Sequence, residues 1–272
     1  MERLPRLPRR PPDAHKGDCG RVVIVAGSRG MAGAAVLASQ AAYRGGAGLV
    51  ILAVPENILD TVAALQVCAI VRAIPVNEDE LEADVLAVGP GLGASPAAVA
   101  EVRRVVATTK RPLVLDADGL NAFVGAPDLL VTSGSPRILT PHPGELARLV
   151  QSTPAAINRA RRPSAEAAAK RFKSIVVLKG RGTVITDGRR TEVNATGNAG
   201  MATGGAGDVL TGLIAALVGQ KMKPWDAARL GVHLHGLAGD LAAEKLGPRS
   251  LMATDLIDFL PAAFLAHERS PR

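Results

Sequence analysis

Aromatic residues are scarce in this chain of 272 residues, because Phe, Tyr and Trp together make up 2% of it. Proteins that read single-stranded nucleic acid by base stacking need aromatic platforms, so this scarcity argues against that class. It also means that the core must be built from Val, Ile, Leu and Ala, since 47% of the residues are hydrophobic. That mixture is typical of a buried parallel sheet flanked by helices.

Cysteine and long apolar runs are also lacking. Cys19 and Cys68 are the two cysteines, and their spacing indicates neither a metal site nor a disulfide framework. No apolar run has membrane-spanning length, and the N-terminus has no hydrophobic signal core. We therefore expect a cytoplasmic protein that has no membrane partner.

Positive charge is in excess, with a formal net charge of +7. Much of it lies at the chain ends and in the run Arg159 to Arg162, and without interleaved aromatics we expect no nucleic-acid partner. A positive field also suits a polyanionic small molecule such as a nucleotide. Residues 1–12 hold four arginines and four prolines and are expected to form a basic, extended arm before a single domain, 13–272.

Short apolar runs alternate with helical segments, which predicts a three-layer α/β/α fold with a central, mostly parallel sheet. Three strands are expected at 22–26, 49–54 and 68–74, and strand-then-loop segments at 84–93, 112–118, 137–145 and 174–180. A hairpin should pair 182–187 with 191–193 across Asp187-Gly188. Helices are expected at 34–44, 95–108, 155–172 with an interruption at Pro163, 225–245 and 254–260.

The stretch from Asn194 to Asp208 contains five glycines and runs directly into an apolar helix. Glycines let backbone N–H groups converge, and a helix N-terminus adds a positive dipole end, so this stretch is suited to hold an anion. Asp208 would repel a phosphate unless it acts as a base on an attacking hydroxyl, which indicates phosphoryl transfer. A tight turn with Asp208 complementing the helix dipole is the structural alternative.

Other chemically suggestive residues follow the expected strands. Ala34 opens a helix after the first strand, and Gly91 lies in a glycine loop that a ligand can approach. Asp116 and Asp118 end a strand, where carboxylates either hold Mg²⁺ or cap a helix.

Three further residues follow later strands. His142 lies between two prolines, in an extended loop. Glu145 opens a helix, as a dipole partner or as a Mg²⁺ ligand through water. Lys179 ends a strand and is either a cation beside a nucleotide phosphate or a solvated lysine. His233 and His235 are two apart on a helix, so they point to different faces and are not expected to form a metal pair.

Six motifs of this chain, taken in order, closely resemble those of the ADP-dependent NAD(P)H-hydrate dehydratases, and the resemblance extends from about residue 13 to about residue 265. Each motif alone has low specificity, but their order is specific. The motifs are His15-Lys-Gly-Asp, Gly89-Pro-Gly-Leu-Gly, Leu115-Asp-Ala-Asp-Gly-Leu-Asn, Leu139-Thr-Pro-His-Pro-Gly-Glu, Val177-Leu-Lys-Gly and Asn198-Ala-Gly-Met-Ala-Thr-Gly-Gly-Ala-Gly-Asp-Val-Leu-Thr-Gly.

The resemblance implies a ribokinase-like fold and a repair reaction. ADP phosphorylates the 6-hydroxyl of the S-form of hydrated NADH or NADPH (NADHX or NADPHX), and phosphate is then eliminated, leaving AMP and the restored coenzyme. The resemblance implies that Asp208 is catalytic and that the substrate contacts are Ala34, Gly91, His142 and Asp208. Implied nucleotide contacts are Lys179, Gly180, Arg181, Gly182, Thr183, Asn198, Gly204, Gly205 and Gly207.

The family pattern further implies Mg²⁺, a homotetramer and, because about a dozen residues precede the match, a separate epimerase as pathway partner. Many family members carry Thr or Ser where this chain has Ala206, which removes a hydroxyl beside the phosphate site. The alternative to repair is a ribokinase-like kinase of a vitamin-precursor alcohol, which would use the same anion site and base but release a stable phosphorylated product.

Overall fold

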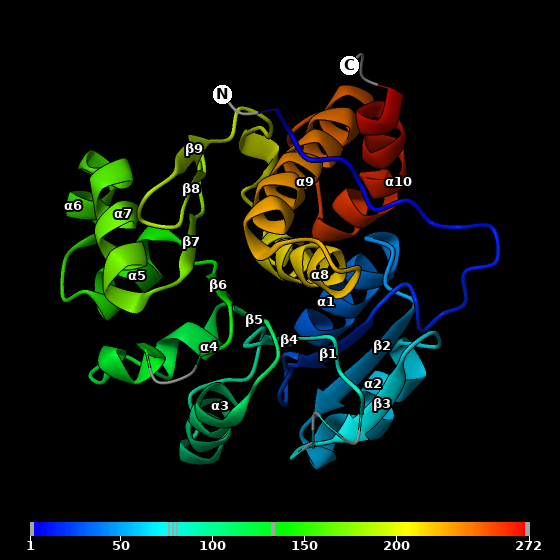
Figure 1. Ribbon diagram of the computed structural model, residues 1–272, viewed down its shortest axis with the longest axis horizontal. Coiled ribbons are helices and arrows are strands. Elements are labelled where there is room, and N and C mark those ends of the chain that lie inside the picture. The colour runs from blue at the N-terminus through cyan, green and yellow to red at the C-terminus, as the bar shows by residue number, and fades with distance from the viewer. Residues whose placement is uncertain (1–2, 76, 78, 80, 132–133, 270–272) are drawn as a thin grey trace.

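The computed structural model describes residues 3–75, 77, 79, 81–131 and 134–269, and its centre is a nine-stranded sheet (Figure 1). The strand order is β3-β2-β1-β4-β5-β6-β7-β8-β9, and all neighbours are parallel up to β7, whereas β8 and β9 are antiparallel. The strands are β1 (Arg21–Val25), β2 (Leu49–Val54), β3 (Ile70–Ala73), β4 (Val85–Val88), β5 (Leu113–Leu115), β6 (Arg137–Leu139), β7 (Ile175–Leu178), β8 (Val184–Thr186) and β9 (Thr191–Val193).

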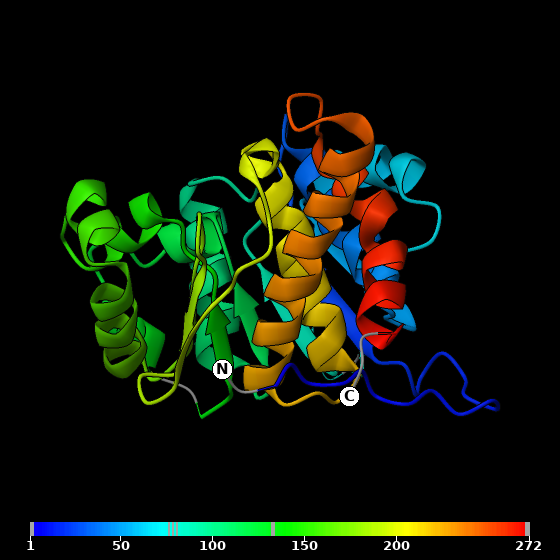
Figure 2. The same cartoon turned by 90° about the horizontal axis from the view of Figure 1, so that it is seen from above.

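Helices cover both faces of this sheet, as Figure 2 shows from above. No described helix has the length and apolar character needed to cross a membrane. The helices are α1 (Ala32–Arg44), η1 (Glu56–Ile58), α2 (Leu59–Leu65), α3 (Pro96–Thr108), α4 (Asp118–Asn121), η2 (Pro127–Val131), α5 (Pro143–Leu149), α6 (Pro154–Arg159), α7 (Arg161–Phe172), η3 (Ala199–Met201), α8 (Ala206–Gly219), α9 (Pro224–Leu246) and α10 (Ala253–Arg269).

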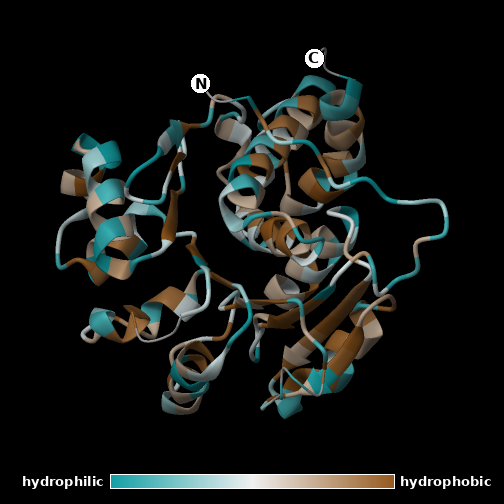
Figure 3. Ribbon diagram, in the orientation of Figure 1, coloured by the Kyte–Doolittle hydropathy of each residue, from teal (hydrophilic) through white to brown (hydrophobic). Residues whose placement is uncertain are grey.

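Alternation along each strand divides the core into two layers. In β1, Val22 and Ile24 pack into the layer that contains α1, α8, α9 and α10, whereas Val23 and Val25 pack into the layer of α3 and α7. Successive side chains of a strand point to opposite faces, so a strand covered on both sides must be apolar throughout. Figure 3 shows these strands as hydrophobic. The three-layer α/β/α prediction is therefore confirmed.

Small residues bring two helices of the first layer close together. A Cβ atom on Gly212 of α8 would lie 2.0 Å from the carbonyl oxygen of Ala38 in α1, so only glycine fits there. A Cβ atom on Gly205, just before α8, would lie 2.5 Å from Leu37. The N-terminal end of α8 is thereby pressed against α1 at the edge where the parallel strands end.

The expected helix 155–172 is two helices, and its predicted interruption at Pro163 is wrong. The break lies at Ala160, and Pro163 is the third residue of α7. A proline is tolerated there because the first N–H groups of a helix have no partner within the helix. The final helix also extends well past Leu260, to Arg269.

The N-terminal residues run along the helices as an extended segment (Figure 1). Arg229 of α9 donates a hydrogen bond to the carbonyl oxygen of Arg3, and Arg10 donates one to the carbonyl oxygen of Gly46. His267 of α10 lies 3.1 Å from the carbonyl oxygen of Pro5. These contacts place the arm at the amino edge of the sheet, because Gly46 lies just before β2.

The sheet order reverses between β1 and β4. From β1 the chain adds β2 and β3 on one side, then returns to place β4 on the other side. The loops that leave β1 and β4 lead to α1 and α3, which belong to opposite layers. In open α/β sheets, a crevice for ligands forms where such loops diverge at the carboxyl ends of the strands.

Candidate active site

The N-terminus of α8 offers a group of backbone donors. Gly205 is its N-cap, with φ of +90°, a conformation that favours glycine. In the described part of the chain, the amides of Gly204, Gly205, Gly207 and Asp208 have no hydrogen-bond partner. Converging free N–H groups at the positive end of a helix dipole are suited to bind a phosphate. The geometry of the predicted anion site is thus present.

A buried histidine holds the first turn of α8. His235 of α9 contacts the carbonyl oxygen of Ala206 through Nε2 at 2.9 Å. Burial lowers the pKa of His235 to about 4, so the ring is neutral and Nε2–H donates to that carbonyl. As their spacing predicts, His233 points elsewhere, toward the ring of His267, but sequence spacing gives no signal for the contact between His235 and Ala206.

Asp208 lies in the first turn of α8 and has an unusual acidity. Its pKa is raised to about 7, first by burial and then by the neighbouring charge of Asp116, while Lys179 opposes the rise. A general base works best when its pKa lies near the working pH. The structure therefore gives Asp208 the acidity expected of a base that removes a hydroxyl proton.

Lys179, at the end of β7, is held by a buried carboxylate. Its Nζ lies 2.5 Å from Oδ1 of Asp116, which is 1% exposed, and Thr211 of α8 donates to Oδ2 of the same carboxylate at 2.8 Å. A Cβ atom on Gly207 would lie 3.3 Å from Nζ. Burial alone would lower the pKa of Lys179, but Asp116 and Glu145 raise it, so the lysine is a cation beside the α8 N-terminus.

His142 and Glu145 form the start of α5. His142 is the N-cap, its Nδ1 accepts from the amide of Gly144 at 3.0 Å, and Oε2 of Glu145 accepts from the amide of His142 at 2.7 Å. Nδ1 is an acceptor, so Nε2 carries the proton and faces Oε1 of Glu145 at 3.3 Å. Burial and then Lys179 lower the pKa of His142. The prediction that His142 lies in an extended loop is confirmed.

Glu145 is buried and lies 3.8 Å from Nζ of Lys179. Burial raises the pKa of Glu145, while Lys179 lowers it. The carboxylates Asp116, Glu145 and Asp208 thus surround one lysine, and each interacts with it electrostatically.

Asp118 connects the site to the loop after β4. Its Oδ2 accepts from the amide of Gly93 at 2.8 Å, and its Oδ1 accepts from Nδ2 of Asn121. Neither Asp116 nor Asp118 caps α4, so the capping alternative is wrong, because the strand end directs Asp116 toward Lys179 and Asp118 toward the glycine loop. On the other side of this loop, a Cβ atom on Gly91 would lie 2.8 Å from Cβ of Ala34. The predicted substrate residues Ala34 and Gly91 are therefore brought together.

The loop Lys179 to Thr183 joins β7 to β8. Arg161 of α7 donates to the carbonyl oxygens of Leu178 and Lys179, and its guanidinium contacts the position of Gly180. Thr183 donates to the carbonyl oxygen of Gly180 at 2.9 Å, whereas Arg181 is exposed. Gly182 has φ of +62°, which makes the tight turn. In the sequence Arg161 belongs to a basic run, and nothing in that run indicates this structural role.

Asn198 uses its side chain within the protein. Its Nδ2 donates to the carbonyl oxygen of Gly239 and to Asp240, and its Oδ1 accepts from the amide of Gly200. These bonds fasten the glycine-rich stretch to α9. The predicted contact of Asn198 with a nucleotide stays a prediction.

The carboxylates do not form a ready-made metal cage. Among the described residues, no group of three or more His, Cys, Asp or Glu side chains is arranged to hold a metal ion. Mg²⁺ is commonly bound by one or two carboxylates together with phosphate oxygens and water. Both oxygens of Asp116 already contact Lys179 and Thr211, so of these carboxylates Glu145 is better suited to that incomplete type of site, in which a nucleotide supplies the remaining ligands.

Comparisons with known proteins agree with this geometry. Residues 22–262 match the family described as NAD(P)H-hydrate dehydratase. The bifunctional NAD(P)H-hydrate repair enzyme Nnr of Moorella thermoacetica is 45% identical over 272 residues, which cover 94% of this chain and 51% of that enzyme. The chain thus spans about half the length of this relative.

Solved structures extend the similarity to the fold. The ADP/ATP-dependent NAD(P)H-hydrate dehydratase of Bacillus subtilis, co-crystallised with ATP and Mg²⁺, has a TM-score of 0.83 and 30% identity and covers 96% of this chain and 94% of its own. A ribokinase-like protein of Enterococcus faecalis has a TM-score of 0.84 and 29% identity, covering 96% and 92%. The fold is therefore ribokinase-like, as expected.

Proposed function

This chain belongs to the NAD(P)H-hydrate dehydratase family, and on that premise we propose that it restores hydrated NADH and NADPH at the α8 N-terminus, with ADP as phosphoryl donor. The observation that supports this most directly is the juxtaposition of free backbone amides with Asp208, whose pKa of about 7 suits a base. The family match also favours repair over the kinase of a vitamin-precursor alcohol.

The proposed reaction has two steps. Asp208 removes the proton of the 6-hydroxyl, whose oxygen forms a bond to the β-phosphorus of ADP while the bond to AMP breaks. The ring nitrogen then donates its electron pair, phosphate leaves with the C6–O bond electrons, and a proton is lost from the adjacent carbon. The amides of Gly204, Gly205, Gly207 and Asp208 and the cation of Lys179 stabilise the charge of the transferred phosphoryl group.

The remaining predicted contacts keep their assignments within this proposal. Gly180 to Thr183, Asn198 and Gly204 to Gly207 line the nucleotide, while Ala34, Gly91 and His142 contact the hydrated dinucleotide. Mg²⁺, held by nucleotide phosphates and by Glu145 through water, would supply positive charge to the phosphates. A homotetramer and an epimerase acting in the same pathway complete the proposal, and sedimentation analysis tests the homotetramer.

The test compares wild type with the Asp208→Asn variant, each incubated with chemically hydrated NADH, Mg²⁺ and either ADP or ATP. The near-ultraviolet absorbance of reduced nicotinamide should recover together with release of free phosphate. In Asp208→Asn the rate should fall about 10²- to 10⁴-fold, because a positioned base is lost, while ADP binding persists. Asp60→Asn, at an exposed position on α2, is the matched control and should keep wild-type rates.

Two results would contradict the proposal. Accumulation of a stable phosphorylated dinucleotide would leave only a kinase, and an Asp208→Asn variant with wild-type turnover would remove Asp208 from the chemistry.

A further inference from the structure

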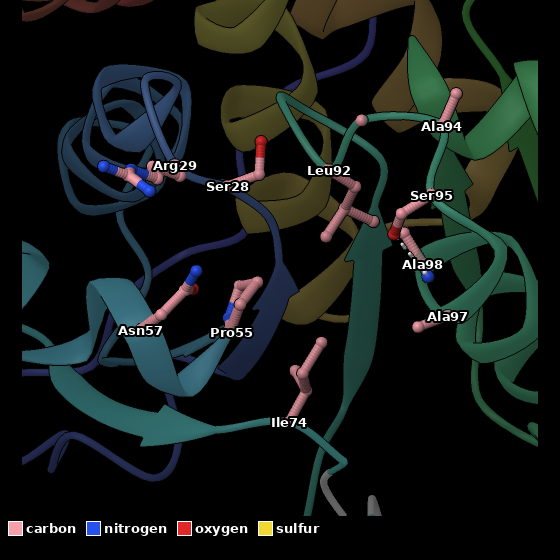
Figure 4. Close-up of a pocket in the computed structure, with 11 residues that line it drawn as sticks. Ser28, Arg29, Pro55, Asn57, Ile74, Leu92, Ala94, Ser95, Ala97 and Ala98 are labelled. Atoms are coloured by element: carbon pink, nitrogen blue, oxygen red, sulfur yellow. Dashed lines mark hydrogen bonds between the residues drawn. The ribbon is translucent and has the colours of Figure 1, made fainter.

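A cavity of about 400 Å³ lies where the sheet order reverses, at the carboxyl ends of β1 to β4 (Figure 4). Ser28 and Arg29 come from the loop after β1, Asn57 from the segment after β2, and Leu92 from the loop after β4. None of these four residues belongs to the phosphoryl-transfer site described above. The position is the one at which open α/β sheets bind ligands.

The walls of this cavity are mainly aliphatic. Figure 4 shows the side chains of Ile74 and Leu92 directed into the space between the loops, with Pro55 beside them and Ala98 on the first turn of α3. The described residues that line it include no aromatic ring. A slot between aliphatic side chains can enclose a flat heterocycle by dispersion and burial, which is how most small-molecule pockets bind their ligands.

Among the described residues that line the cavity, Arg29 is the one that carries a charge. It is exposed, and in the described part of the chain its guanidinium has no hydrogen bond or ion pair. The side chain of Asn57 is likewise without a partner there, whereas Ser28 donates to the carbonyl oxygen of Gly91 at 2.8 Å. A free guanidinium beside an aliphatic cavity suits a heterocycle that carries a phosphate, because the guanidinium can bind phosphate through two N–H groups.

The loop after β4 links the cavity to the reacting centre. Gly93 lines it and donates its amide to Asp118, whose charge acts on Asp208. The Gly91 turn beside it packs against Ala34. A dinucleotide with its nicotinamide at Asp208 would therefore cross the Gly91 to Gly93 loop and bring its other half to the cavity.

We propose that this cavity binds the adenosine half of the hydrated dinucleotide and that Arg29 binds the 2′-phosphate by which hydrated NADPH differs from hydrated NADH. The inference rests on the proposed function, because that function supplies the dinucleotide. A 2′-phosphate is a dianion at neutral pH and the corresponding hydroxyl is uncharged. Arg29 therefore makes the chain prefer hydrated NADPH.

The kinetic test compares the two substrates in Arg29→Gln. KM for hydrated NADPH should rise about tenfold, the equivalent of about 1.4 kcal/mol for a lost charge-assisted bond. KM for hydrated NADH and for ADP, and kcat, should stay unchanged. Arg44→Gln removes the same charge at the exposed opposite end of α1 and should alter nothing. Equal changes for both substrates, or none, would overturn the role of Arg29.

Calorimetry with intact NADP⁺ and NAD⁺ measures the role of Arg29 in binding without any turnover. Wild type should bind NADP⁺ about tenfold more tightly than NAD⁺, Arg29→Gln should bind both equally, and Ala97→Trp, which narrows the cavity, should weaken both. Unchanged binding in Ala97→Trp would remove the adenosine half from the cavity. If repair fails while the NADP⁺ preference depends on Arg29, the proposed function falls and the cavity assignment stands.

Discussion

The acidity of Asp208 depends on a few neighbouring charges, and this dependence can be measured. With a pKa of about 7, Asp208 is protonated in acid, so kcat/KM should fall as pH drops below about 7. Asp116 raises the pKa of Asp208, so Asp116→Asn should move this acid limb to lower pH. The same change should lower kcat, because Lys179 loses its nearest anion.

The pH profile of kcat/KM for wild type, Asp116→Asn and Asp60→Asn separates these effects. Asp60 is exposed on α2, so its variant should reproduce the wild-type limb. A limb that moves to higher pH in Asp116→Asn would contradict the charge arrangement. Asp116→Asn is expected to change both the pH of the acid limb and the plateau of the profile. Loss of folded protein would lower the plateau and leave the pH of the limb unchanged.

Asp116 also shows what the sequence could predict at this scale. Its residue type and its place at a strand end leave a Mg²⁺ ligand and a helix cap as alternatives; the structure excludes the cap, and the Mg²⁺ role stays a prediction. Its partner Lys179 is 63 residues away, and the contact exists only because β5, β6 and β7 are neighbours in the sheet. Residue type and local position suggest chemistry, whereas the pairing of charges requires the fold.

At the scale of elements, α8 and α9 are coupled by His235, and the coupling should depend on pH. The folded-state pKa of His235 is lowered from 6.5 to about 4, so the folded protein binds fewer protons than the unfolded chain between these values. Its contribution to stability is therefore complete above pH 6.5 and is lost as pH falls to about 4. This contribution is at most about 3 kcal/mol.

Urea unfolding between pH 4 and pH 8 tests that coupling in His235→Gln, whose amide can still donate to Ala206. The free energy of unfolding of the variant should depend less on pH than that of wild type, although His142 and His233, whose pKa values are also lowered, retain part of the dependence. His15→Gln changes an exposed histidine and should keep the wild-type slope. An unchanged slope in His235→Gln would exclude His235 as the titrating link.

Elements themselves were predictable to different degrees. The strands were recovered because buried β-branched runs such as Val22 to Val25 have few alternatives in a sheet covered on both faces. The break between α6 and α7 was misplaced because Pro163 is acceptable in a first helical turn, and the real break at Ala160 carries no distinctive residue. Strand content follows from composition, whereas helix ends depend on local backbone contacts.

At the scale of the whole molecule, the N-terminal arm fastens distant parts of the helical layer. Arg229 holds the carbonyl of Arg3, Arg10 holds that of Gly46, and Leu7 packs against the core. These contacts lie at the amino edge of the sheet, away from the α8 N-terminus. Removing residues 1–12 should therefore affect stability and leave catalysis unchanged.

We expect the shortened chain to unfold several degrees below the full chain, since each 1 kcal/mol lowers Tm by about 2–4 °C in a protein of this size. Leu7→Ser should give a smaller decrease because the two backbone contacts remain. Differential scanning calorimetry measures both, and kcat and KM of the folded protein at low temperature should match wild type. A loss of kcat without a change in Tm would contradict this prediction. It would mean that the arm acts at the active site and not through its contacts with Gly46 and Arg229.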